Sequence, residues 1–207
     1  PVKYDEARMS FEELIRKEGL DYEAFTVITE DGYHLTVQHV KAKGLASGSP
    51  VAFFQHGLFS SSDTWIHGLS ISPAIRAANA GYDVWLGNNR GTQYSRKHNT
   101  LDPLKIADQK QYFDYSFFEL GKYDAPAQID FVRHKTGRDK VTFIGHSQGT
   151  MQMFSALSEG FGDLKDKINL FVAICPITNM GHAAKAEFLP ETEKKYKNFE
   201  NLMAPLN

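Results

Sequence analysis

The chain has 207 residues, of which 42% are apolar, 13% aromatic and 23% charged, and its formal net charge is −2. This composition is typical of a folded globular protein and excludes an intrinsically disordered chain, which has few apolar residues and a high net charge. The near-neutral charge offers no basic surface, so no nucleic-acid partner is expected. The longest dense apolar stretch, residues 168–177, is shorter than the roughly 18 residues of a membrane-spanning helix.

Cys175 is the only cysteine, so no disulfide can form within the chain, and no Asn-x-Ser/Thr glycosylation sequon occurs. Both absences argue mildly against a secreted protein stabilised by disulfides, and they keep an intracellular organelle open as the compartment. Cys175 follows an apolar run, which predicts a buried and inert thiol.

The first 40 residues predict a short helix followed by a β-hairpin. Ser10 and Glu13 form the sequence pattern of a capping box, so a helix should begin after Ser10. Residues 24–29 and 33–40 alternate between apolar and polar positions, and Asp31-Gly32 between them is a strong hairpin signal. A small polar loop, residues 41–50, follows the hairpin.

Beyond residue 50, predicted strands alternate with predicted helices. The expected strands are residues 51–55, 82–86, 141–145 and 169–174; the expected helices are residues 72–79, 124–135 and 148–158; residues 87–110 read as one long irregular stretch. Strands that are apolar throughout and separated by helices predict a mostly parallel sheet with helical crossovers. The last strand would form an exposed apolar edge, which natural proteins avoid, so another segment should pair with it.

The most informative segment is VTFIGHSQG, residues 141–149, in which Ser147 lies between a predicted strand and a predicted helix. The pattern Gly145-His146-Ser147-Gln148-Gly149 is that of a nucleophile elbow. Side chains at Gly145 or Gly149 would collide with neighbouring backbone in so tight a turn. The elbow raises the Ser147 hydroxyl above the sheet, where the backbone N–H of Gln148 can face a developing oxyanion. The His146 side chain should project away from Ser147.

A second candidate loop, His56-Gly57-Leu58, directly follows the predicted strand 51–55. An oxyanion hole needs a second N–H from the loop after this strand, and Leu58 is placed to supply it. Gly57 would let the backbone approach a substrate closely. His56 is expected to buttress the loop.

Six segments make the chain recognisable: TEDGYHL (residues 29–35), QHGL (55–58), AGYDVWLGNNRG (80–91), YSRKH (94–98), KYDAPAQI (122–129) and IGHSQGT (144–150). In this order they resemble the acid lipase family, the α/β-hydrolases that include gastric and lysosomal acid lipases. The resemblance runs from about residue 11 to residue 178 and implies an α/β-hydrolase fold. We therefore expect residues 1–178 to be the N-terminal part of that core, incomplete at its C-terminus, and residues 179–207 to begin a cap.

The resemblance also implies hydrolysis of a lipid carboxylic ester, such as a triacylglycerol or a steryl ester. Ser147 would be the nucleophile, and the N–H groups of Leu58 and Gln148 would hold the oxyanion. A lysosomal or secreted location and transient contact with a lipid interface are implied as well. Five aromatic residues could line an acyl pocket or belong to the ordinary core: Phe59, Trp65, Phe113, Phe117 and Phe118.

The catalytic triad that the resemblance implies is incomplete in this chain. The acid and then the histidine should follow the serine in sequence, but the only histidine after Ser147 is His182, which comes too early. The Asp and His are therefore expected from a C-terminal continuation or from a second polypeptide. No metal is expected: His34 and His39 face opposite sides of their strand, and no CxxC or HExxH occurs. No cofactor is expected either, because no Gly-x-Gly-x-x-Gly or Walker loop is present.

Two alternative functions stay open at this point. A non-catalytic scaffold or interaction subunit could retain the fold and the elbow, and the incomplete triad favours it. A thioesterase or acyltransferase could use the same serine. The intact elbow and oxyanion loop favour an enzyme, because a scaffold has no need of a strained serine.

Overall fold

The computed structural model describes residues 5–178. The chain divides at Pro176 into two units, the first of which holds the sheet. The expected cap segment, residues 179–207, lies outside the described residues, and so does His182.

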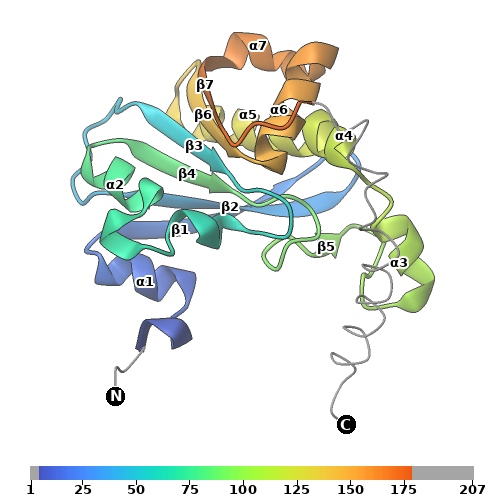
Figure 1. Cartoon of the computed structure of the whole chain (residues 1–207), viewed down its shortest axis with the longest axis horizontal. Coiled ribbons are helices and arrows are strands. Elements are labelled where there is room, and N and C mark those ends of the chain that lie inside the picture. Colours follow the sequence, from blue (N-terminus) through green and yellow to red (C-terminus); the bar gives the residue numbers. More distant parts are fainter. Residues whose placement is uncertain (1–4, 179–207) are drawn as a thin grey trace. The chain divides into compact units, whose positions relative to one another are not determined.

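The described part is a seven-stranded sheet flanked by helices (Figure 1). Along the sheet the strands follow the order β1-β2-β4-β3-β6-β7, and β5 pairs with β2. The strands are β1 (Asp21–Ile28), β2 (Tyr33–Lys41), β3 (Val51–Gln55), β4 (Asp83–Gly87), β5 (Lys97–His98), β6 (Val141–His146) and β7 (Ile168–Ile174). The α-helices are α1 (Phe11–Lys17), α2 (Pro73–Asn79), α3 (Ile106–Tyr112), α4 (Phe117–Glu119), α5 (Ala125–Thr136), α6 (Gln148–Glu159) and α7 (Leu164–Lys167). Single 3₁₀ turns occur at Asp5–Arg8, Ser62–Trp65, Leu69–Ile71 and Phe161–Asp163.

The N-terminal elements form as their local sequence predicts. Ser10 caps α1 in a reciprocal capping box with Glu13. β1 and β2 pair antiparallel, with Val27 opposite Leu35, and Gly32 adopts φ 98° in the turn between them. Only glycine takes up such a conformation without strain, so the Asp31-Gly32 signal has a direct physical basis.

Alternate residues of the central strands face opposite sides of the sheet and build two hydrophobic cores. On β3, Ala52 and Phe54 pack with α1 and α2, whereas Val51 and Phe53 pack with α5, α6 and α7. All five residues of β3 are buried. Figure 1 shows α1 and α2 on one face of the sheet and α5 and α6 on the other. The expected α/β fold with an N-terminal hairpin is confirmed. The sheet is mixed: β3, β4, β6 and β7 are parallel, whereas β2 pairs antiparallel with β1, β4 and β5.

The stretch predicted as irregular, residues 87–110, is partly regular. β5 pairs antiparallel with the start of β2, through Tyr33–His98 and His34–Lys97. Helix α3 follows, and α5 is preceded by α4 and a π-helical turn, Leu120–Asp124. These elements depend on long-range pairing and packing, which overrides a weak local pattern.

The expectation that Cys175 is buried is wrong. The residue follows β7, has φ 50° and is exposed. Within the described part of the chain, β7 pairs only with β6, so it forms one edge of the sheet. Three apolar side chains on one face of β7 are substantially exposed: Leu170 at 54%, Val172 at 36% and Ile174 at 38%. The predicted apolar edge strand is therefore present in the described residues.

Candidate active site

Four parallel strands, β3, β4, β6 and β7, end at the same edge of the sheet. His56 begins the loop after β3, and Ser147 directly follows β6. The last residue of β3, Gln55, pairs in register with Gly145 of β6. The parallel pairing therefore brings the two loops that the sequence singled out next to each other.

Ser147 lies in a strained turn between β6 and α6. Its backbone has φ 51° and ψ −115°, a region that residues with a side chain seldom occupy. Its N–H donates to the carbonyl of Ile174 on β7 at 3.0 Å, and its carbonyl accepts from the N–H of Thr150 at 2.9 Å. Such strain persists only where surrounding structure enforces it, and it is concentrated at functional sites.

The two glycines of the elbow have no space for a side chain. A Cβ on Gly145 would lie 2.8 Å from the carbonyl oxygen of Gly149. A Cβ on Gly149 would lie 2.7 Å from the oxygen of Gln55 and 2.8 Å from the oxygen of His56. Both collisions are with backbone atoms, which cannot move aside as a flexible side chain would. Helix α6 thus packs directly against the end of β3.

Gly57 holds the other loop against the elbow. A Cβ at this position would lie 3.1 Å from the Cβ of Ser147 and 3.1 Å from Nδ1 of His146. The next two side chains project outward, with Leu58 56% exposed and Phe59 94% exposed at φ 56°. The Gly57–Leu58 peptide therefore lies beside the strained serine.

His56 is almost fully buried, at 2% exposure, and both of its ring nitrogens are engaged. Nδ1 donates to the carbonyl oxygen of Gly57 at 2.7 Å, and Nε2 accepts from the backbone N–H of Asn89 at 3.1 Å. Burial lowers the pKa of His56 to about 4, so the ring is neutral at ordinary pH. A neutral ring with no free nitrogen cannot accept the Ser147 proton; it fixes the orientation of the loop.

Four other histidines, His34, His39, His98 and His146, have partners of their own. His146 lies edge-on to Trp65, with ring centroids 6.4 Å apart. His39 lies between two carboxylates, Glu23 and Asp83, and stacks on Trp85. His34 contacts Asn99, and His98 contacts the carbonyl of Asp31.

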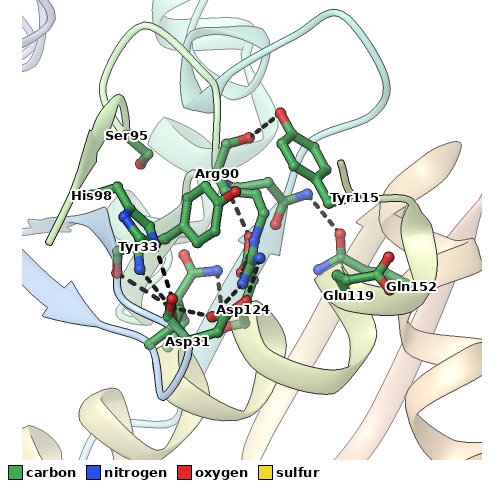
Figure 2. Close-up of polar contacts among 12 residues, drawn as sticks. Asp31, Tyr33, Arg90, Ser95, His98, Tyr115, Glu119, Asp124 and Gln152 are labelled. Carbon is green, nitrogen blue, oxygen red and sulfur yellow. Dashed lines mark hydrogen bonds and ion pairs between the residues drawn. The ribbon is translucent and has the colours of Figure 1, made fainter. Parts of the chain in front are cut away.

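The sequence did not single out the charged cluster that fixes the loop after β4 (Figure 2). The Arg90 side chain is 1% exposed, and its two terminal nitrogens donate to the two oxygens of Asp31 at 2.6 and 2.9 Å. Its Nε and its backbone N–H donate to the fully buried Asp124 at 2.8 and 2.9 Å. Burial alone would raise the pKa of Asp31, but hydrogen bonds from Arg90 and Thr29 outweigh it and lower that pKa below its usual value. A signal was present in the polar run Asn88-Asn89-Arg90, which directly follows a buried strand.

The five aromatic residues considered for an acyl pocket divide between core and surface. Trp65 is 3% exposed and belongs to the core beside Phe54. The other four are exposed: Phe59 at 94%, Phe113 at 52%, Phe117 at 39% and Phe118 at 38%. For Trp65 the structure thus favours the core interpretation.

Two cavities in the described residues lie away from Ser147. The larger, about 530 Å³, is lined by residues of β1, β2, β4 and the loop after β2, including His39 and Trp85. The other, about 450 Å³, lies near Val51 and Arg138, where β3 and β6 begin. Within residues 5–178, no group of three or more histidine, cysteine or carboxylate side chains is placed to hold a metal. Nor does any helix in this part of the chain have the length and apolarity to cross a bilayer.

Two family models match the chain. Residues 11–69 match the partial alpha/beta-hydrolase lipase region, and residues 50–206 match the alpha/beta hydrolase fold. Among solved structures, an esterase from Pyrococcus furiosus aligns with a TM-score of 0.57 at 18% identity, covering 87% of this chain and 63% of that one. An epoxide hydrolase from Vigna radiata aligns with a TM-score of 0.52 at 20% identity, covering 86% of this chain and 47% of that one. These structural likenesses show the fold.

Curated relatives are more similar in sequence. The chain is 40% identical to human lipase member M over 184 residues, 86% of this chain and 42% of that protein. It is 42% identical to mouse gastric triacylglycerol lipase over 183 residues, 86% of this chain and 45% of that protein. It is 38% identical to human lysosomal acid lipase/cholesteryl ester hydrolase over 180 residues, 84% of this chain and 44% of that protein. The chain spans about half the length of the curated relatives that it matches.

The resemblance to gastric and lysosomal acid lipases is thus confirmed, and with one family model covering residues 50–206 the chain belongs to the α/β-hydrolase fold family.

Proposed function

We propose that this chain is the nucleophile-bearing part of a serine lipase that hydrolyses carboxylic esters of lipids, with a triacylglycerol or a steryl ester as substrate. The names of its relatives support the substrate class, since they include a triacylglycerol lipase and a cholesteryl ester hydrolase. The observation that carries the proposal is the positive φ of Ser147 beside the Gly57 loop. A protein that served only as a scaffold has no need to maintain this strain.

In the proposed reaction, Ser147 Oγ attacks the ester carbonyl carbon while its proton passes to a histidine. The tetrahedral intermediate is stabilised by the backbone N–H groups of Leu58 and Gln148. It collapses to an acyl-enzyme and releases the alcohol, which takes the proton; water then releases the fatty acid by the reverse steps. Neither N–H group has a hydrogen-bond partner within the described residues, so both are free to donate.

The base and its orienting acid belong, in this proposal, to residues outside the chain. His56 is excluded by its two hydrogen bonds, and the rings of His34, His39 and His98 are bound to other groups. A C-terminal continuation or a second polypeptide would supply the Asp and the His. The same segment would pair with the edge of β7 that has no partner among residues 5–178, and it would cover the exposed apolar side chains of this strand.

The relatives also support a location and a mode of access to substrate. Gastric and lysosomal lipases among them favour a secreted or lysosomal protein, and an intracellular organelle is the alternative suggested by the single cysteine and the absence of sequons. A lipid ester is reached at an interface, so we propose transient contact with lipid rather than permanent insertion.

The test is the Ser147→Ala variant of the protein in its complete, active form. Turnover of tributyrin and of cholesteryl oleate should fall to background while the melting temperature stays unchanged. A fluorophosphonate should label the wild-type protein on the peptide that contains Ser147. The matched control is Ser158→Ala, a solvent-exposed serine on the same helix, which should keep full activity. Retained turnover in Ser147→Ala would place the nucleophile elsewhere, and absence of turnover and labelling in the wild type would favour the scaffold.

A further inference from the structure

The loop after β4 touches both sides of the candidate site through one residue, Asn89. Its backbone N–H donates to Nε2 of His56, the ring that holds the Gly57 carbonyl. Its side-chain Nδ2 donates to Oε1 of Gln152 on α6 at 2.7 Å. Figure 2 shows Gln152 on its helix, beside the loop that carries Arg90. Asn89 therefore bridges the loop after β3 and the helix that begins behind the nucleophile.

Each end of this bridge is close to one of the two proposed oxyanion donors. In a trans peptide the C=O and the following N–H point in opposite directions. The His56 hydrogen bond to the Gly57 carbonyl therefore fixes the direction of the Leu58 N–H. On the other side, Gln152 lies one helical turn after Gln148. A hydrogen bond that holds Gln152 therefore also holds the first turn of α6, where the Gln148 N–H lies.

The bridge is buried and has no duplicate among the described residues. His56 and Asn89 are each 2% exposed, and Gln152 is fully buried. The other polar side-chain atoms of the pair, Asn89 Oδ1 and Gln152 Nε2, have no partner in residues 5–178. Two amides that each leave one buried atom unpaired are a poor device for stability alone, because such atoms cost free energy. Their single shared hydrogen bond fixes the distance between the loop after β4 and helix α6.

We infer that Asn89 and Gln152 are positioning residues, which together hold the Leu58 and Gln148 N–H groups at the spacing that the oxyanion requires. This inference rests on the proposed function. Arg90, the residue after Asn89, is held by hydrogen bonds to Asp31 and Asp124, so it anchors the backbone of the bridge. The pair does not touch the reacting atoms; it acts through His56 and through the start of α6.

The experiment compares Asn89→Ala, Gln152→Met and the double variant in the complete, active protein, with p-nitrophenyl butyrate as a water-soluble ester. The matched control is Gln38→Met, since Gln38 is also a buried glutamine with one side-chain hydrogen bond, to Tyr22 on β1, away from the site. Each single variant should lose about tenfold or more in kcat, with KM within about twofold of wild type. A boronic acid that mimics the tetrahedral intermediate should bind more weakly by a similar factor.

The double variant is the decisive measurement. If the two residues act through one bond, its loss in kcat matches that of the more damaging single variant. Multiplied losses, an unchanged kcat in the single variants, or an equal loss in Gln38→Met would each overturn the inference while leaving the lipase assignment intact. If Asn89→Ala does not fold, Gln152→Met removes the same bond from the other side. A wild-type protein with no ester turnover would instead overturn the proposed function and this inference together.

Discussion

Gly57 and Ser147 are in direct contact: a Cβ on Gly57 would lie 3.1 Å from the Cβ of Ser147. The loop after β3 thus lies against the strained backbone of Ser147, and a methyl group at Gly57 fits only if one of the two shifts slightly. The position of this loop and that of the serine are therefore mechanically linked. A change at Gly57 moves the proposed Leu58 donor without removing any functional group.

This contact predicts that Gly57→Ala reduces kcat with little effect on stability. A shift of a few tenths of an ångström accommodates the methyl group, and misplacement of an oxyanion donor by that amount should lower kcat by about 10- to 100-fold. The comparison is Gly68→Ala, where a Cβ would lie 3.0 Å from the exposed Ile71 side chain, which can move aside. Steady-state kinetics and thermal melts of both variants measure the effect, and equal kcat values in the two would contradict it.

Gly149→Ala, in contrast, should affect folding itself. Its Cβ would lie 2.7 Å from the carbonyl oxygen of Gln55, so helix α6 and strand β3 would have to separate. We expect a loss of about 3 kcal/mol in the free energy of unfolding, as is typical of overpacking in a core. Gly160→Ala meets nothing within 4 Å and has only its φ of 72° against it, so it should cost about 1 kcal/mol. Urea denaturation gives both values, and a reversed ranking would contradict the steric argument.

The sequence predicted the parts of this site that depend on local chemistry. The elbow and the loop after β3 follow short buried strands, and both carry the glycines that close packing demands. It did not predict the Asn89 bridge or the Arg90 clamp, because their partners lie 63 and 59 positions away in the chain. β5 was missed for the same reason: two residues have no strand pattern until β2 offers them a partner.

Cys175 shows the limit of composition as a guide to burial. Its apolar neighbours on β7 suggested a buried thiol, but one face of β7 is exposed within the described residues. An apolar strand is buried only where another layer covers it. The burial of β7 therefore depends on which segment pairs with it, and local sequence does not contain that information.

The buried His56 ring predicts a pH-dependent stability. Its pKa is about 4 in the folded protein, against an ordinary value of 6.5, because burial disfavours the charged ring. The unfolded chain therefore binds more protons between these two values, so stability falls as the pH is lowered from about 6.5 to about 4. The full effect is roughly 3 kcal/mol, at 1.36 kcal/mol for each pKa unit.

The His56→Asn variant isolates this effect. An asparagine amide can still donate to the Gly57 carbonyl but has no titrating nitrogen. Urea denaturation between pH 7 and pH 4 should show a shallower fall in the unfolding free energy than in the wild type. His134→Asn, at an exposed position on α5, is the control and should retain the wild-type slope. An identical slope in all three proteins would rule out His56 as the titrating group.

Arg90→Lys should be strongly destabilising although it conserves the charge. A lysine ammonium cannot make the paired bonds to Asp31 together with the side-chain bond to the fully buried Asp124. A buried carboxylate left without its partner typically costs about 3–5 kcal/mol. The control is Arg133→Lys, whose partner Asp130 is 45% exposed, and it should change stability by less than about 1 kcal/mol. Equal unfolding free energies for the two variants would show that the Arg90 clamp is not structural.

Within the described residues, one edge of β7 has no partner strand, which predicts that the 207-residue chain associates with itself when produced alone. Leu170, Val172 and Ile174 expose one apolar face, and the outer edge of the strand offers unpaired backbone groups to another strand. Sedimentation velocity over a range of concentrations should therefore detect oligomers. Val172→Lys should reduce them, because a charged side chain on an edge strand opposes pairing. Thr26→Lys, on the opposite edge strand β1, introduces the same charge and should leave the association unchanged. A wild-type chain that sediments as a monomer throughout would show that β7 needs no partner, and it would weaken the case for a completing segment.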